Sequence, residues 1–279
     1  MIGRAARRRW SLGLATLLGR ERGFFIPYRL AGSAAPPGPY VELERRFAAR
    51  TGEFREIIQG LDRLARTLEA IGRDDGEPRP PRWDQGWFPR MDAAVAYAMV
   101  RWLQPKRIVE VGAGHSTRFL ARAASDGRTG TRITTIDPEP RAALYGLDFE
   151  FIRAPVQQAN RAVFDALAPG DFLFVDSSHV LMPGTDVDVI LNRIWPSLAN
   201  GVVVHVHDIF LPDPYPDAWS WRGYNEQNAV GVLIANGAEI LWSSHYAATR
   251  LKDSLEGTVV SRLPLFPGAI ESSLWIRKA

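Results

Sequence analysis

The 279-residue chain contains no cysteine, which excludes disulfide bonds, thiol nucleophiles and every metal or iron–sulfur site built on cysteine. It also lacks any apolar run near the ~20 residues that a bilayer-spanning helix needs. An apolar run near the N-terminus, Trp10–Leu18, is short and is followed by the charged residues Arg20-Glu21-Arg22. No small-residue cleavage site of a secretory signal follows it. We therefore expect a soluble, cytoplasmic protein with no integral membrane segment.

Basic charge is concentrated at the N-terminus. Seven arginines and one glutamate give residues 1–30 a net charge of +6, which leaves −3 on the remainder of a chain whose total is +3. A mildly acidic body argues against a nucleic-acid-binding face. The basic stretch predicts an N-terminal helix that is solvated, packed against a partner, or in weak contact with an anionic membrane surface.

Residues 1–82 differ in pattern from residues 83–279, which predicts a helical N-terminal extension followed by a catalytic domain. The extension consists of the basic helix, a Gly/Pro-rich linker over Gly32–Pro39, one long amphipathic helix over 40–72 and a second linker over Arg73–Arg82. Apolar residues recur at helical spacing along the long helix. We expect its apolar face to pack on the body or on a second copy of the chain, as in a homo-oligomer.

From Met91 onward, helical and strand patterns alternate. Short apolar strands are predicted at 107–111, 131–136, 149–153, 171–175, 201–206, 239–243 and 272–277, and helices at 92–103, 115–124, 139–145, 160–167, 186–198 and 224–236. This alternation predicts an α/β fold with a doubly wound, mostly parallel, Rossmann-like sheet. Ligands of such sheets bind at the carboxyl ends of the strands, so function is expected there.

The first predicted strand ends in the sequence EVGAGHST (110–117). Gly112 and Gly114 permit a tight turn and the close approach of a ligand to the backbone. A dinucleotide fingerprint would place a third glycine at position 117, where Thr117 stands, so the motif argues against NAD. Asp137 ends the second strand 25 residues after Gly112, near the interval at which an acid binds ribose hydroxyls. Alternatively, Asp137 caps a helix that begins at Glu139.

Two later strands also end in polar residues. The fourth ends in VDSSH (175–179) and the fifth in HVHD (205–208). Because neighbouring strand ends converge, we expect Asp176, His179 and Asp208 to share one site. Alternation along the fifth strand instead turns His205 into the core.

Together, the pieces VGAGHST, VDSSH and HVHDIF resemble the class I S-adenosylmethionine-dependent methyltransferases, in particular their methyltransferase-24-like branch, over Met91–Ser243. The resemblance implies a seven-stranded sheet with an antiparallel last strand and methyl transfer from S-adenosylmethionine. It also implies an adenine contact near Gln157. The implied cofactor-binding residues are Glu110, Gly112, Gly114, His115, Ser116, Thr117, Asp137, Gln157, Asp176 and Ser177.

The same strand ends resemble the metal-dependent small-molecule O-methyltransferases. That resemblance implies a divalent ion such as Mg²⁺ or Mn²⁺ at Asp176, Asp208 and His207. Without a metal, Asp176 or His179 would act as general base and Asp208 would orient the substrate.

Loop 211–224 is dense in proline, tryptophan and tyrosine, which predicts a lid over an apolar pocket, and Trp87–Arg90 would close the other side. The predicted function is methyl transfer from S-adenosylmethionine to an oxygen of a small molecule, with Asp176, His179 and Asp208 as catalytic residues. Two alternatives remain open: a non-catalytic scaffold that dimerises through residues 40–72, and a nicotinamide-dependent oxidoreductase.

Overall fold

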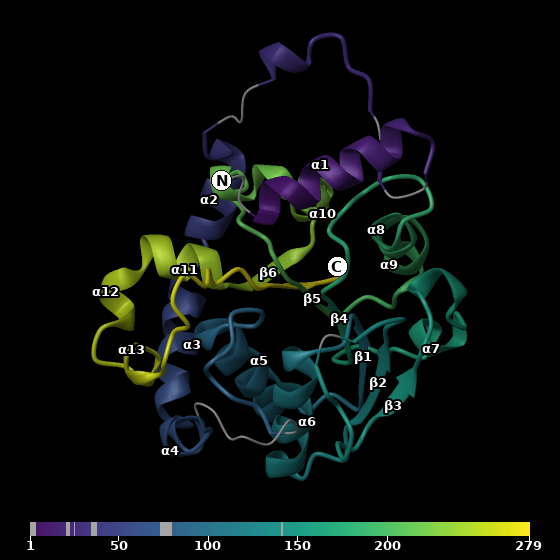
Figure 1. Cartoon of the computed structure of the whole chain (residues 1–279). Helices are drawn as coiled ribbons and strands as arrows, with labels where there is room; N and C mark the ends of the chain where they lie inside the picture. Colours follow the sequence, from purple (N-terminus) through teal and green to yellow (C-terminus); the bar gives the residue numbers. More distant parts are fainter. Residues whose placement is uncertain (1–3, 21–22, 25, 35–37, 73–79, 141) are drawn as a thin grey trace.

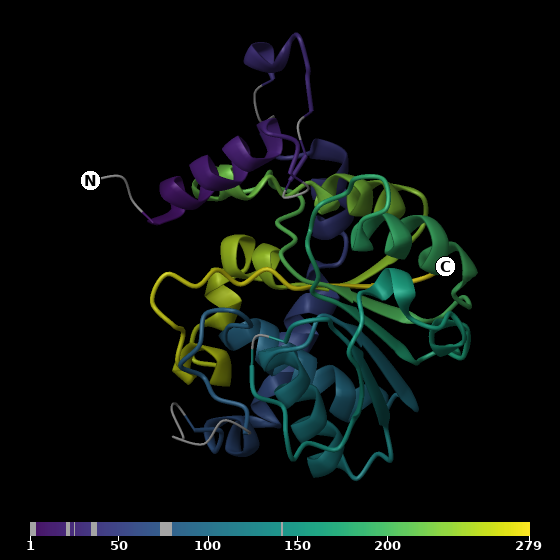
Figure 2. The same cartoon turned by 45° about the vertical axis from the view of Figure 1, so that its right-hand side comes forward.

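The computed structural model describes residues 4–20, 23–24, 26–34, 38–72, 80–140 and 142–279. A seven-stranded sheet runs through its centre in the order β3-β2-β1-β4-β5-β7-β6, with helices on both faces (Figures 1 and 2). Only β7 is antiparallel to its neighbours. The strands are β1 (Arg107–Val111), β2 (Arg132–Ile136), β3 (Glu150–Ile152), β4 (Phe172–Val175), β5 (Val203–Val206), β6 (Glu239–Ser243) and β7 (Leu274–Arg277). The predicted α/β fold is confirmed.

Strand order creates the crevice in which a ligand can bind. The chain runs outward from β1 through β2 to β3, and then returns to the other side of β1 with β4. In doubly wound sheets, such a reversal opens a crevice at the carboxyl ends of the two central strands. Both β4 and β5 are buried along their whole length, which explains their continuous apolar sequences. Polar residues therefore begin only where these strands end.

Helices on both faces cover the sheet. They are α5 (Arg90–Leu103), α6 (His115–Gly127), α7 (Ala162–Asp165), α8 (Asp186–Val189), α9 (Trp195–Ser197) and α10 (Glu226–Ala235), with a π-helical segment, Ile190–Ile194, joining α8 to α9. Three further helices between β6 and β7 were not predicted: α11 (Ser244–Arg250), α12 (Lys252–Leu255) and α13 (Val259–Arg262). Together with the extension described below, α13 helps to enclose α5.

The predicted helix over 139–145 is wrong for the described residues of that segment, which form bends and turns. Glu139 precedes Pro140, and the residue before a proline is disfavoured in helical backbone. The amide of Glu139 instead donates to Asp137 Oδ1 at 2.6 Å. Asp137 is therefore not the cap of a helix, and this alternative falls away.

The N-terminal extension contains α1 (Arg4–Leu17), a short 3-10 turn (Ala31–Ser33) and three helices, α2 (Val41–Ala48), α3 (Thr51–Asp62) and α4 (Ala65–Glu69). The prediction of one long helix over 40–72 is therefore wrong. Phe47, Phe54, Leu61 and Leu68 recur every seven residues, and a stripe of that period drifts around a straight helix by about 20° per heptad. The turns between the helices keep all four side chains against the body, where they are fully buried.

The extension shares one core with the sheet. Phe54 packs edge-on against Trp242 of β6 at 5.5 Å between ring centroids, and Phe47 stacks on Tyr246 of α11 at 5.6 Å. Residues 35–37 of the first predicted linker and 73–79 of the second lie outside the described residues. The division of the chain at residue 82 stays a prediction. Within the described part, no helix is long and apolar enough to cross a membrane.

Candidate active site

The turn after β1 is shaped by the end of β4. Gly112 has φ +94°, and a Cβ at this position would lie 1.9 Å from the carbonyl oxygen of Asp176, so only glycine fits. Gly114 differs, because its backbone is extended and a Cβ there would meet no atom of the described residues within 4 Å. The first glycine therefore serves the fold, and the second leaves open space beside the turn.

Glu110 holds this turn from behind. It is completely buried, and its carboxylate accepts hydrogen bonds from the hydroxyls of Ser116 (2.6 Å), Thr117 (2.7 Å) and Thr135 (2.9 Å). The Thr117 hydroxyl in turn accepts from the amide of Gly114 at 3.0 Å. Glu110 and Thr117 thus fix the turn and do not line the cavity in front of it.

Burial raises the pKa of Glu110 to about 7, although the three hydroxyl donors counteract the shift. Because the folded pKa lies above the ordinary value of 4.5, the group stabilises the fold fully below pH ~4.5 and loses that contribution as the pH rises through 7. Relative to Glu110→Gln, the free energy of unfolding of the wild type should fall by about 3 kcal/mol between pH 4.5 and 8. Urea denaturation across this range measures it, and a difference independent of pH would contradict the shift.

Asp137 ties the ends of β1 and β2 together and faces the cavity. Its Oδ2 accepts from the amide of Ala113 at 2.6 Å, while Oδ1 accepts from Glu139 as described above. Each carboxylate oxygen retains a further lone pair that can accept from a ligand hydroxyl. The residue therefore has the position and the acceptor capacity that the sequence predicted for it.

A cavity of about 650 Å³ lies at the carboxyl ends of β1, β2 and β4. The size falls within the range of small-molecule sites. Trp87 and His115 both line the cavity and stack on each other, with ring centroids 5.8 Å apart and an interplanar angle of 7°. Burial lowers the pKa of His115 to about 4, so this imidazole is neutral. The predicted cofactor residues that line the cavity are Gly112, Gly114, His115, Ser116, Asp137, Gln157, Asp176 and Ser177.

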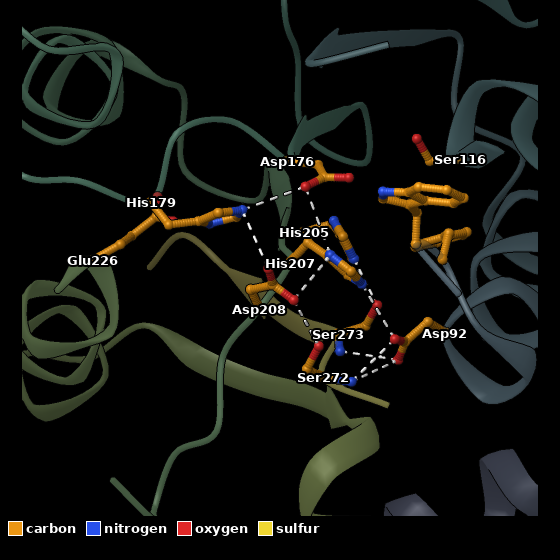
Figure 3. A network of polar contacts seen from close by, with 12 residues as sticks. Asp92, Ser116, Asp176, His179, His205, His207, Asp208, Glu226, Ser272 and Ser273 are labelled. Carbon is orange, nitrogen blue, oxygen red and sulfur yellow. Dashed lines mark hydrogen bonds and ion pairs between the residues drawn. The ribbon is translucent and has the colours of Figure 1, made fainter. Parts of the chain in front are cut away.

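Four polar side chains meet at the ends of β4 and β5, and we call Asp176, His179, His207 and Asp208 the strand-end cluster (Figure 3). The Nε2 atom of His179 lies 3.4 Å from Asp176 Oδ1 and 3.5 Å from Asp208 Oδ2. The Nδ1 atom of His207 lies 3.6 Å from Asp176 Oδ1 and 3.4 Å from Asp208 Oδ1. Carboxylates and imidazoles therefore alternate around the cluster. The structure brings together the three residues predicted to be catalytic.

The backbone is strained at two members of the cluster. His179 has φ +60° and Asp208 has φ +55°, and neither is a glycine. Left-handed backbone at non-glycine residues costs of order 1–3 kcal/mol and concentrates at functional sites, where the surrounding structure enforces it. Strain at both residues supports a functional role for the cluster.

A second buried carboxylate holds each histidine from its far side (Figure 3). Glu226, the first residue of α10, lies 2.8 Å from His179 Nδ1. Asp92, in the first turn of α5, lies 3.2 Å from His207 Nε2 and accepts from the amides of Ser272 and Ser273. Sequence reasoning missed both acids.

Charge balance fixes the protonation of the cluster. Burial alone would lower the pKa of His179, but its hydrogen bonds to Asp176 and Glu226 and the charge of Asp208 raise this pKa well above its usual range. Burial would likewise raise the pKa of Asp176, but His207 and His179 hold this pKa well below its usual range. At neutral pH the free cluster therefore holds His179 protonated beside the ionised carboxylate of Asp176. His205, by contrast, is a core residue, as predicted: its ring stacks on Phe174 at 3.6 Å.

The residues predicted to hold a metal were tested against this geometry. In the described part of the chain, no three histidine, cysteine or acidic side chains are arranged as the ligands of one ion. The Nδ1 atom of His207 lies 3.6 Å from Asp176 Oδ1 and 3.4 Å from Asp208 Oδ1, as in two ion pairs. As arranged here, Asp176, His207 and Asp208 do not form the predicted ligand set.

The predicted lid, loop 211–224, contacts the cluster at its last residue, Tyr224. A 3-10 helix, Asp217–Arg222, lies within it. The ring of Tyr224 lies 4.7 Å from that of His179, and the Asn225 side chain exchanges two hydrogen bonds with the backbone of Leu181. On the opposite side, Trp87 and Phe88 line the cavity. The cluster therefore has an aromatic neighbour in the lid, and its acid Asp176 also lines the cofactor-sized cavity.

The sheet order and the site at its carboxyl edge are those of the class I methyltransferase fold. Residues 109–209, from β1 to just beyond β5, match the family model of a methyltransferase domain. The chain therefore carries a methyltransferase domain of the S-adenosylmethionine-dependent class. No curated protein matches the chain.

Several solved structures are similar in fold at low identity. The S-adenosylhomocysteine-bound methyltransferase PaMTH1 of Podospora anserina is 15% identical, covering 92% of this chain and 99% of that one, with a TM-score of 0.41. An O-methyltransferase of Bacillus cereus is 13% identical over 80% of this chain and 91% of that one (TM-score 0.42). A putative caffeoyl-CoA O-methyltransferase of Staphylococcus aureus is 14% identical over 86% and 100% (TM-score 0.41). Likeness at this level indicates no shared substrate.

Proposed function

We propose that this protein transfers the methyl group of S-adenosylmethionine to an oxygen of a small molecule, and that the strand-end cluster removes the proton of the acceptor. One observation carries the proposal: Asp176 belongs both to the cofactor-sized cavity and to the cluster. An acceptor bound between them would meet the methyl donor on one side and proton acceptors on the other.

The cofactor would be held by the residues at the ends of β1 to β3. Gly114 offers open space where a ligand can approach the backbone. Asp137 would accept hydrogen bonds from the ribose hydroxyls. Gln157, which also lines the cavity, would contact adenine, as the family resemblance implies. Glu110 contributes indirectly by fixing the turn.

The reaction requires positioning and one proton transfer. The bond between the methyl carbon and the sulfonium sulfur breaks as the acceptor oxygen attacks, which yields S-adenosylhomocysteine and a methyl ether. In-line alignment of the two molecules contributes through proximity and orientation. His179 is the proton acceptor in this proposal, because Glu226 fixes its Nδ1 and leaves its Nε2 facing the cluster.

Asp176 and Asp208 then orient the acceptor. Because the neighbouring carboxylates hold His179 protonated in the free site, this imidazole must first release its Nε2 proton to solvent before it can accept the proton of the acceptor. The raised pKa then makes the neutral imidazole a stronger base than an ordinary histidine. Asp176 is itself a weak base, because its pKa is held low. The lid residues above His179, including Tyr224, would exclude water from the transfer.

Metal removal tests the proposed chemistry. We expect the protein to transfer radiolabelled methyl from S-adenosylmethionine to an acceptor found by screening hydroxylated small molecules, and to keep this activity after dialysis against a chelator. The sequence predicted the alternative, Mg²⁺ or Mn²⁺ at Asp176, His207 and Asp208. Activity lost on chelation and restored by either ion would overturn the metal-free assignment.

A further inference from the structure

An amphipathic helix normally turns its apolar face toward the protein, but α1 does the opposite. Trp10, Leu14 and Leu17 follow one another at i, i+4 and i+7 and so share one face of the helix. Their side chains are 74%, 59% and 67% exposed. Ala15 and Thr16, which lie away from this face, are half-buried, and the other α1 residues whose burial is described are exposed. Contacts within the described chain leave the apolar face of α1 uncovered.

The exposed apolar surface continues beyond the helix. Nine of the nineteen exposed large apolar residues of the described chain lie between positions 10 and 30. Besides those on the face of α1 they are Leu12, Leu18, Phe24, Ile26, Tyr28 and Leu30. Figure 2 shows α1 at one end of the molecule, beside the rest of this segment and away from the lower part of the sheet. We call the described residues between positions 4 and 30 (4–20, 23–24 and 26–30) the N-terminal patch.

Charge identifies the occupant of this patch. Residues 1–30 carry seven arginines against one glutamate, while the remainder of the chain is net negative. Arg7, Arg20 and Arg29 are exposed among the apolar side chains. Guanidinium groups bind phosphate well, and exposed apolar chains flanked by arginine suit the headgroup layer of a bilayer. A second copy of this chain would offer the arginines a net negative body, whereas an anionic bilayer surface offers negative charge and an apolar layer together.

We propose that the N-terminal patch docks on the surface of an anionic lipid membrane, with α1 lying in the plane of the headgroups. Apolar insertion and basic attraction together supply the two signals that stable peripheral binding requires. The docking does not depend on methyl transfer. Two residues of the patch, Gly23 and Phe24, also line the cofactor cavity. The test variants are therefore placed in α1, whose residues do not line this cavity.

Vesicle co-sedimentation of the full chain tests the proposal. The wild type should bind phosphatidylglycerol vesicles at least tenfold more tightly than phosphatidylcholine vesicles, and raising the salt should weaken the binding. The double variant Trp10→Asp/Leu14→Asp should lose at least tenfold in affinity. The matched control Leu103→Asp/Tyr145→Asp also replaces an exposed leucine and an exposed aromatic residue, but outside the patch, and should bind like the wild type.

Circular dichroism and the melting temperature establish that all variants fold. The proposal is overturned if the wild type does not bind phosphatidylglycerol vesicles, or if Trp10→Asp/Leu14→Asp binds them equally well. Light scattering without lipid measures the oligomeric state and so tests the alternative that a second copy of the chain occupies the patch. A wild-type dimer that becomes monomeric in this variant, with no vesicle binding, would assign the patch to a second copy and also overturn the proposal.

Discussion

His179→Ala should lower kcat by about 10²- to 10⁴-fold, the usual contribution of a positioned general base, while leaving the affinity for S-adenosylhomocysteine unchanged. The loss corresponds to about 3–5 kcal/mol of activation free energy. Cofactor affinity should persist because the His179 side chain belongs to the strand-end cluster and does not line the cavity. Radiolabelled methyl transfer to the acceptor found by screening measures kcat, and calorimetry measures the cofactor affinity.

Glu226→Gln is the milder variant to compare with His179→Ala, because it leaves the His179 side chain in place. The amide keeps the size of the carboxylate but removes the charge that holds the far nitrogen of His179 at 2.8 Å. We expect kcat to fall by less than in His179→Ala, with little change in KM. A His179→Ala enzyme with normal turnover would show that another group takes the proton, and Asp176 would be the next residue to test.

The two glycines of the turn should respond to substitution in opposite ways. Gly112→Ala should cost more than about 2 kcal/mol of folding stability, because its Cβ would overlap the Asp176 carbonyl and its φ is +94°. Gly114→Val should fold with a loss of about 1 kcal/mol at the start of α6, because valine is a poorer N-cap than glycine. Its side chain would occupy the open space of the cavity, so affinity for S-adenosylhomocysteine should fall at least tenfold.

Thermal denaturation and calorimetry on the two variants separate these effects. If Gly114→Val binds S-adenosylhomocysteine like the wild type, the open space beside the turn is not the cofactor site. If Gly112→Ala is as stable as the wild type, the close approach of β4 to the turn is not a constraint on the sequence.

Sequence predicted the inner part of the site because its residues directly follow buried strands. Asp137, Asp176 and Asp208 are the first acids after apolar runs, and strand ends converge by the geometry of a parallel sheet. Asp92 and Glu226 could not be found in this way. Both lie in the first turn of a helix, where an acid is expected simply because it complements the helix dipole. Only the tertiary fold shows that they face His207 and His179.

The helical parts were predicted less well, for a related physical reason. The spacing of Phe47, Phe54, Leu61 and Leu68 indicates which side chains are buried. It does not indicate where the helix is interrupted, although a seven-residue repeat cannot stay on one side of a long straight helix. The role of Glu110 in fixing the turn was also not predicted from its position in the sequence. Glu110 stands where the family suggests a cofactor contact, yet three hydroxyl donors occupy its carboxylate behind the turn.

Calorimetric titration of S-adenosylhomocysteine into the wild-type chain, with NAD titrated in parallel, tests the central claim most directly. The account predicts saturable binding of one S-adenosylhomocysteine per chain and no binding of NAD, because Thr117 bonds to Glu110 where a dinucleotide turn would need glycine. Binding of NAD in place of S-adenosylhomocysteine would favour an oxidoreductase. Binding of neither would contradict the assignment of the cavity and favour a scaffold that keeps the fold without the cofactor.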